Sequence, residues 1–141
     1  MAMQWLARRE HSRRELQDKL IKKGCDAALA TEVVNKMESE HLVSDDRFME
    51  SLIRVRRSKG YGPVRIQKEL LEKGVESEAI SNCLDVTGQG WLEDIRRVQR
   101  KKFGGKIPKS YAERARQARF LQYRGFTYDQ IQQLLNPRGQ D

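Results

Sequence analysis

The sequence contains little cysteine and proline and no long hydrophobic run. Its 141 residues include two cysteines and three prolines. Cys25 and Cys83 are too few for a disulfide framework, so we expect both thiols to stay reduced. No apolar stretch approaches the roughly 18 residues of a membrane span, and the apolar residues at the N-terminus stop at Arg8, which makes them too short for a secretory signal. These absences predict a cytoplasmic protein without a membrane partner.

Recognisable catalytic and metal-binding motifs are also missing. His11 and His41 lack the spacing to cysteines or carboxylates that a metal site requires, and we expect both at the surface. Asp45 and Asp46 diverge by about 100° on a helix, so they favour a helix N-terminus more than shared acid–base chemistry. Residues 104–106, Gly-Gly-Lys, lack the other residues of a phosphate-binding loop. We therefore expect no enzymatic activity, no cofactor and no metal.

Positive charge is what the sequence has in excess. It contains 28 lysines and arginines against 20 aspartates and glutamates, a net charge of +8. Seven of the cations fall between Arg96 and Lys109, where there is no acidic residue. A single exposed cation can simply keep a surface solvated. A run of this kind favours a polyanion or an acidic protein surface as the binding partner.

Three glycines mark an internal repeat. Gly24, Gly74 and Gly125 are 50 and 51 residues apart, and each follows a cation and stands four residues after a leucine. The units also open on aromatic residues at equal intervals of 43, namely Trp5, Phe48 and Trp91. A glycine after a cation is typical of the C-terminal end of a helix. The pattern predicts three copies of a three-helix unit.

The repeat predicts the fold class and the domain organisation. We expect an all-α protein made of three tandem three-helix repeats over residues 1–43, 44–87 and 88–141, with a frayed tail after Asn136. Units of about 45 residues bury too little surface to be stable alone. We therefore expect the repeats to stack into an elongated or curved body, and the protein to be a monomer.

Local signals predict where several helices begin. Three pairs have the spacing of a capping box: Ser12 with Glu15, Ser110 with Glu113, and Thr127 with Gln130. Asp26 is placed to cap the third helix of the first repeat. Gly60 is placed to end the first helix of the second repeat, and Gly62 to cap the next helix with Pro63 at its first position.

Apolar spacing predicts which side chains are buried. In the first helix of the second repeat, Phe48, Leu52 and Val55 share one face, while Arg54 and Arg57 lie on the opposite face. Both arginines should therefore be replaceable without disturbing the core. Helical spacing also assigns Leu29 and Leu71 to buried positions. Cys25 and Cys83 occupy the positions of apolar residues in the other repeats, so we expect both thiols in the core.

Several segments closely resemble the RecX family. They are residues 6–12 and 45–48, the segment 59–63 from Lys59 to Pro63, and residues 100–104 and 120–125. The resemblance covers nearly the whole chain. It implies an all-helical protein that lies in the groove of the RecA recombinase filament and inhibits recombination, ATP hydrolysis and co-protease activity. It would thereby modulate DNA repair and the SOS response, with single-stranded DNA inside the filament as a second candidate partner.

The basic helices are the candidate contact surface for the filament or its DNA. The predicted contact residues are Arg54, Arg57, Lys59, Arg65, Arg96, Arg97, Arg100, Lys101, Lys102 and Lys106. The alternative is a general DNA-binding module, because three-helix units with a basic helix also describe helix-turn-helix folds. The second helices of the repeats share no base-reading pattern at their starts, so such a module would act through phosphate contacts.

Overall fold

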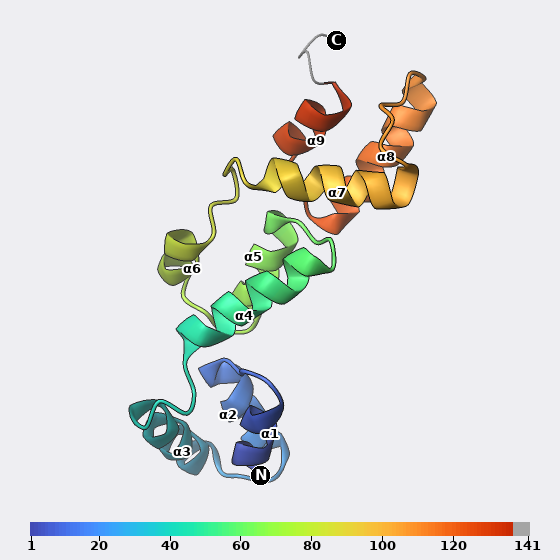
Figure 1. Ribbon diagram of the computed structural model, residues 1–141. Helices are drawn as coiled ribbons and strands as arrows, with labels where there is room; N and C mark the ends of the chain where they lie inside the picture. Colours follow the sequence, from blue (N-terminus) through green and yellow to red (C-terminus); the bar gives the residue numbers. More distant parts are fainter. Residues whose placement is uncertain (137–141) are drawn as a thin grey trace. The chain divides into compact units, whose positions relative to one another are not determined.

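The computed structural model describes residues 1–136, and over this range it contains nine α-helices and no strand (Figure 1). The all-α prediction is confirmed. The helices are α1 (Ala2–Arg8), α2 (Arg13–Lys22), α3 (Ala27–Ser39), α4 (Asp45–Ser58), α5 (Pro63–Glu72), α6 (Ser77–Cys83), α7 (Trp91–Phe103), α8 (Tyr111–Arg124) and α9 (Tyr128–Leu135). The frayed tail predicted after Asn136 lies outside the described residues.

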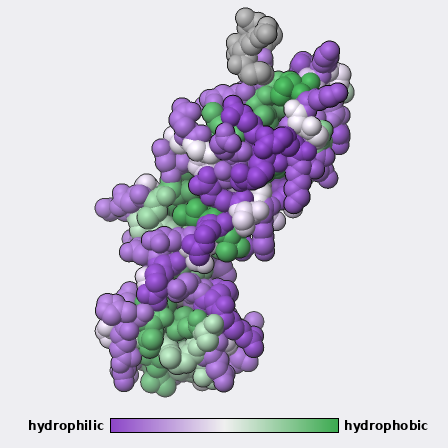
Figure 2. All heavy atoms as spheres, in the orientation of Figure 1, coloured by the Kyte–Doolittle hydropathy of each residue, from purple (hydrophilic) through white to green (hydrophobic). Residues whose placement is uncertain are grey.

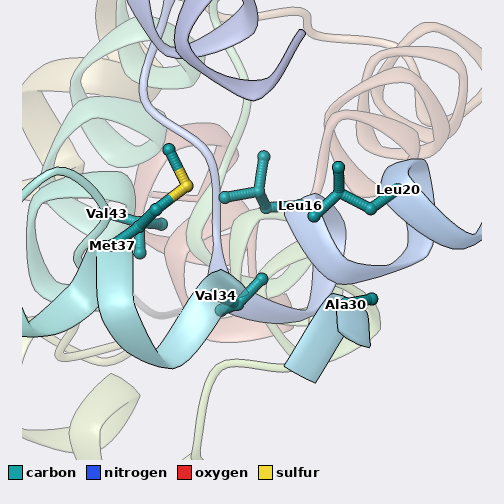
Figure 3. Close-up of a cluster of buried hydrophobic side chains, with 6 residues drawn as sticks. All are labelled: Leu16, Leu20, Ala30, Val34, Met37 and Val43. Atoms are coloured by element: carbon teal, nitrogen blue, oxygen red, sulfur yellow. The ribbon is translucent and has the colours of Figure 1, made fainter. Parts of the chain in front are cut away.

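The contacts divide the chain into two compact units. The first unit consists of Met1–Ile53 and Glu69–Cys83, and the second of Arg54–Lys68 and Leu84–Asp141. In the first unit, α2 packs against α3. Figure 3 shows the core of this helix pair, which is formed by Leu16, Leu20, Ala30, Val34, Met37 and Val43. α1 covers this core with the partly buried side chains of Trp5 and Leu6.

The core of the second unit forms where α7 contacts both α8 and α9 (Figure 1). Trp91, Ile95 and Val98 are buried on one face of α7, as the apolar spacing predicts. α8 contributes Leu121, and α9 contributes Ile131 and two leucines. The opposite face of α7 is left for solvent and for charged side chains, which is the arrangement expected of an amphipathic helix.

Two of the three predicted capping boxes are complete. Ser12 and Thr127 each accept a hydrogen bond from the backbone N–H three residues later, and Glu15 and Gln130 bond back to the backbone of the capping residue. Ser110 accepts the bond from the Glu113 backbone, but the Glu113 carboxylate bonds Arg116 and Gln117. The prediction for Asp26 is wrong in part. Asp26 occupies the capping position, yet its exposed side chain makes no capping hydrogen bond.

Helix ends meet in both units. In the first unit the Ser12 hydroxyl donates to the Lys73 carbonyl at 2.7 Å, next to Gly74. In the second unit the Gly62 amide donates to the Arg124 carbonyl at 2.7 Å, and the Val64 amide donates to the Gly125 carbonyl at 2.9 Å. Each contact joins the N-terminus of one helix to the C-terminus of another. Donors and acceptors that have no partner within their own helix are thereby satisfied, and the helix dipoles attract.

Five predictions of burial are wrong or only partly right. Leu29 and Leu71 are 50% and 46% exposed, and Cys83 is exposed. In each case the next or the preceding residue occupies the core position instead, and adjacent residues on a helix point about 100° apart. Val55 is 38% exposed at the edge of the apolar stripe of α4. Cys25 is partly buried and packs against the first core, so its assignment holds only in part.

His11 is buried, which corrects the prediction that it lies at the surface. Its side chain is 1% exposed, with Nδ1 3.1 Å from the Arg9 carbonyl and Nε2 2.8 Å from the Lys19 ammonium. A charged lysine only donates, so Nε2 accepts and Nδ1 carries the proton. Burial lowers the pKa of His11, and the nearby positive charges of Arg9 and Lys19 lower it further. His11 is therefore neutral in the folded protein near pH 7.

The buried carboxylate of Glu15 lies beside this histidine. Burial alone would raise its pKa, but hydrogen bonds from Arg9 and the charge of Lys73, 3.4 Å away, lower the pKa to about 2. Relative to an ordinary pKa of 4.5, this shift corresponds to on the order of 3 kcal/mol of stability. A carboxyl group whose pKa is lowered by folding stabilises the folded state at pH values above its unfolded pKa. For Glu15 this contribution is lost as the pH falls from 4.5 towards 2.

We expect His11 to make the protein less stable in mild acid. Its folded pKa is below the unfolded value of 6.5, so the unfolded chain binds the proton more tightly and stability falls as the pH drops below 6.5. The measurement is the thermal midpoint at pH 7.5 and pH 5.5, for the parent and for His11→Gln. The thermal midpoint of the parent should fall more on acidification than that of the variant, because the variant has no imidazole to protonate. An equal loss in both proteins would show that other groups control this range.

Candidate anion-binding surface

All ten predicted contact residues lie in the second unit. Five of them are exposed on α7: Arg96, Arg97, Arg100, Lys101 and Lys102. The acidic residues of α7 are in its first turn and three cations are in its last turn, so both charges complement the helix dipole. Figure 2 shows that the visible face over α7 is strongly hydrophilic. Lys106 follows in the connection to α8, where the buried side chain of Gln99 bonds its carbonyl at 3.0 Å.

A cleft of about 310 Å³ opens beside these cations. It lies among the end of α4, the outer side of α7 and the last turns of α8. Its lining residues are Ser58, Lys59, Gly60, Arg97, Val98, Lys101, Lys102, Phe120 and Arg124. Five of the nine are cations and none is acidic. The cleft can therefore accept a ligand with several negative charges.

Phe120 is the aromatic residue in the wall of the cleft. Lys102 Nζ and Arg124 Cζ each lie 5.2 Å from the centre of its ring. Phe103 meets the same ring edge-on, with the two centroids 5.4 Å apart. The Arg124 guanidinium also donates to the Lys59 carbonyl at 3.0 Å. Arg124 is thus held by the backbone just after α4 and by an aromatic ring. This reduces the conformational freedom that its side chain would lose on binding an anion.

Arg65 belongs to a second group of arginines and aromatic rings. Its guanidinium lies 4.2 Å from the ring centre of Tyr61 and 5.4 Å from that of Tyr123. Arg124 Cζ also lies 5.0 Å from the ring centre of Tyr61. Tyr123 remains 74% exposed. This combination of exposed ring and adjacent cation is the kind of surface on which nucleic-acid bases stack.

Arg57 has a structural role, which corrects the prediction that it can be changed freely. Its Nε and Nη2 donate to the two carboxylate oxygens of Asp94, both at 2.8 Å, and Asp94 is buried. The guanidinium also lies 4.3 Å from the ring centre of the buried Trp91. These hydrogen bonds to the Asp94 carboxylate raise the pKa of Arg57. Arg97 is 3.6 Å from the same carboxylate but stays exposed.

We predict that Arg57→Ala destabilises the second unit, whereas Arg54→Ala does not. Removal of the Arg57 guanidinium takes both 2.8 Å hydrogen bonds from the buried carboxylate of Asp94, while Arg97 stays 3.6 Å away. The loss of a charged hydrogen-bond pair of this kind costs about 2 kcal/mol or more. Arg54 is exposed on the same helix, so its substitution should cost less than about 0.5 kcal/mol. Urea unfolding of both variants measures the difference. Equal midpoints would show that the Asp94 pair contributes nothing to stability.

Family models match three segments of the chain. They are RecX, first three-helix domain, over residues 1–37, RecX, second three-helix domain, over residues 44–84, and RecX, third three-helix domain, over residues 92–135. The chain belongs to the RecX family. The resemblance inferred from the sequence is therefore confirmed.

Relatives within the RecX family match nearly the full length. The Regulatory protein RecX of Pseudomonas fluorescens strain Pf-5 is 41% identical over 140 residues, which are 99% of this chain and 90% of that protein. The Regulatory protein RecX of Pseudomonas putida is 42% identical with the same coverage. These relatives are named as regulatory proteins, which supports a regulatory role for this chain.

A crystal structure of RecX from Lactobacillus salivarius has the same fold. It matches with a TM-score of 0.76 at 22% identity, covering 96% of this chain and 90% of that one. Within residues 1–136, no helix is long and apolar enough to cross a membrane. In the same range, no three histidine, cysteine or acidic side chains gather as a metal site would require.

Sequence reasoning missed two residues of the cleft, Phe120 and Arg124. Both were visible in the sequence as part of a segment that resembles the RecX family, and Arg124 was recognised only as the cation before a helix-ending glycine. Nothing in the local pattern indicates that the last turns of α8 lie against the end of α4. Conversely, Arg57 and Arg65 were predicted as contact residues but are engaged by other side chains of their own unit.

Proposed function

We propose that this RecX family member binds the RecA–DNA filament and inhibits the recombination, ATP hydrolysis and co-protease activities of RecA. It would thereby modulate DNA repair and the SOS response as a non-enzymatic regulator in the cytoplasm, acting as a monomer without a cofactor. The observation that supports this proposal most directly is the exposed cationic face of α7 in a chain of the RecX family. A regulator that docks on another macromolecule needs such a surface and no catalytic group.

The charge of this face matches what a protein–DNA filament offers. DNA carries a phosphate at every nucleotide, and cations on a protein surface steer it towards such an anionic partner. Arg54, Arg96 and Arg100 are exposed. Within residues 1–136, Arg96 alone of the three forms an ion pair, with Glu93 at 3.6 Å. Exposed ion pairs at this distance contribute little, so these side chains can turn towards a partner at low cost. They are the contacts we propose for the filament.

A general DNA-binding module is the second candidate. The aromatic rings of Tyr61 and Tyr123 beside Arg65 favour it, because bases can stack on such rings without sequence preference. The starts of α2, α5 and α8 carry no common set of base-reading side chains, so this candidate would act through phosphate contacts.

Co-sedimentation separates the two candidates. RecA filaments are assembled on single-stranded DNA with a non-hydrolysable nucleotide and compared with the bare DNA at the same salt concentration. We expect this protein to pellet with the filament at concentrations where bare DNA retains little of it. Equal retention by filament and bare DNA would contradict the RecA proposal and favour the general DNA-binding module.

We predict that the affinity for DNA alone is weak and strongly dependent on salt. The basic surface lacks base-reading side chains, so binding comes from counterion release and should fall steeply between about 50 and 200 mM salt. Fluorescence anisotropy with a labelled oligonucleotide measures the slope. Tight, sequence-selective binding to a duplex at the higher salt would favour the second candidate.

A further inference from the structure

The cleft beside Phe120 is lined by more cations than are paired with carboxylates. Lys59 comes from the end of α4, Lys101 and Lys102 from α7, and Arg124 from α8, with Arg97 completing the lining. In the part of the chain that the structure describes, Arg97 is the one cation of this lining that pairs with a carboxylate, that of Asp94 at 3.6 Å, and Arg57 already bonds that carboxylate. Like charges that converge around one space repel each other unless an anion enters it.

Two other clefts of similar size differ from this one. One, in the first unit, is lined by cations and also by three carboxylates, those of Glu15, Asp18 and Glu72. Another, in the second unit, has only Arg96 and Arg100 as charged lining residues. Neither combines a strong excess of positive charge with an aromatic wall. Solvation of the surface alone therefore does not explain why five cations and no acidic residue line the cleft beside Phe120.

The number of cations indicates the charge of the ligand. A single phosphate group is balanced by one or two lysines or arginines, whereas five cations around about 310 Å³ match two or more adjacent phosphates. The volume is within the range of small-molecule sites. Phe120 and Val98 supply apolar lining against which a ring can pack. A carboxylate-bearing peptide would use the charge but not this aromatic wall.

We propose that the cleft lined by Lys59, Lys101, Lys102 and Phe120 binds a nucleotide with two or more adjacent phosphate groups. The nucleotide comes either from a free nucleoside triphosphate or from successive units of a nucleic-acid single strand. The lysines and arginines contact the phosphates, and the apolar lining contacts the nucleoside. This site goes beyond the proposed filament binding, since none of Arg54, Arg96 and Arg100 lines the cleft.

Calorimetric titration of the full chain, without RecA, tests the site. The ligands are adenosine triphosphate, adenosine monophosphate, an eight-nucleotide single strand and an eight-residue polyglutamate, all at about 50 mM salt. The cleft variant carries Lys59→Gln, Lys101→Gln and Lys102→Gln. The matched variant carries Arg8→Gln, Lys22→Gln and Lys23→Gln, which removes the same charge from exposed positions in the first unit, outside the cleft and outside the proposed filament contacts.

We expect the triphosphate or the single strand to bind the parent at least ten-fold more tightly than the monophosphate or polyglutamate does. The cleft variant should lose at least ten-fold of this affinity and the matched variant less than three-fold. Binding of the triphosphate identifies a free nucleotide as the source, and binding of the strand alone identifies nucleic acid. Equal losses in the two variants, equal binding of polyglutamate, or no binding of either phosphate ligand would overturn the proposal. Because RecA is absent, each result is independent of the filament experiment.

Discussion

Replacing Arg54, Arg96 and Arg100 by glutamate is expected to weaken inhibition of the DNA-dependent ATP hydrolysis of RecA by roughly 100-fold. The three side chains are exposed, so each substitution should change the free energy of unfolding by less than about 0.5 kcal/mol. Binding should suffer far more, because like charges would then face each other across the interface and cost on the order of 3 kcal/mol. This corresponds to an increase of roughly 100-fold in the concentration needed for half-inhibition.

A matched reversal in the first unit controls for net charge. Arg8, Lys22 and Lys23 are exposed cations near the ends of α1 and α2, and reversing them changes the total charge by the same amount. We expect this variant to inhibit within a few-fold of the parent. Arg57 is left unchanged in both proteins because its loss would unpair the buried Asp94. Parent-like inhibition by the Arg54, Arg96 and Arg100 variant would mean that these cations serve solvation only and that the contact lies elsewhere.

Gly125→Ala should be among the most destabilising single substitutions in the second unit. Gly125 has a φ of +102°, a conformation that costs an alanine about 1 kcal/mol. A β-carbon there would also lie 2.4 Å from Arg65 Cβ and 2.8 Å from the Arg65 amide nitrogen, so the backbone must move. Such a shift would strain the hydrogen bond from Val64 to the Gly125 carbonyl. We expect a total loss of about 3 kcal/mol, from the sum of strain and a weakened hydrogen bond.

Gly104→Ala is the matched control for this prediction. Gly104 also ends a helix of the second unit, with a φ of +90°, but a β-carbon there meets no atom within 4 Å. Its substitution should therefore cost only the backbone strain of about 1 kcal/mol. Urea unfolding monitored by circular dichroism compares the two variants. Equal losses would show that the close approach of α5 and α8 does not contribute to stability.

Features that depend on residues close together in the sequence could be predicted. The helix stops at the repeated glycines and the boxes at Ser12 and Thr127 need only residues within one turn, and the buried face of α7 follows from a 3.6-residue period. The three-helix repeat was visible because the same short-range pattern recurs. The burial of Leu29 and Leu71 was predicted wrongly because both lie at the edge of an apolar stripe. The helical period does not show how much of that stripe the neighbouring helices cover.

The sequence by itself thus determined the helical repeats, their ends, the excess of positive charge and the resemblance to the RecX family. Tertiary structure alone decided which cations are available to bind a partner and which are held by other residues of the protein. Arg57 lies 37 residues from the carboxylate of Asp94 that it bonds, and Arg124 lies 65 residues from the Lys59 carbonyl. Residues so far apart share no local pattern, and in a single sequence an arginine that supports a core looks the same as one that faces solvent. Packing brings the partners together, and only then do a buried ion pair and a cation-lined cleft become distinct.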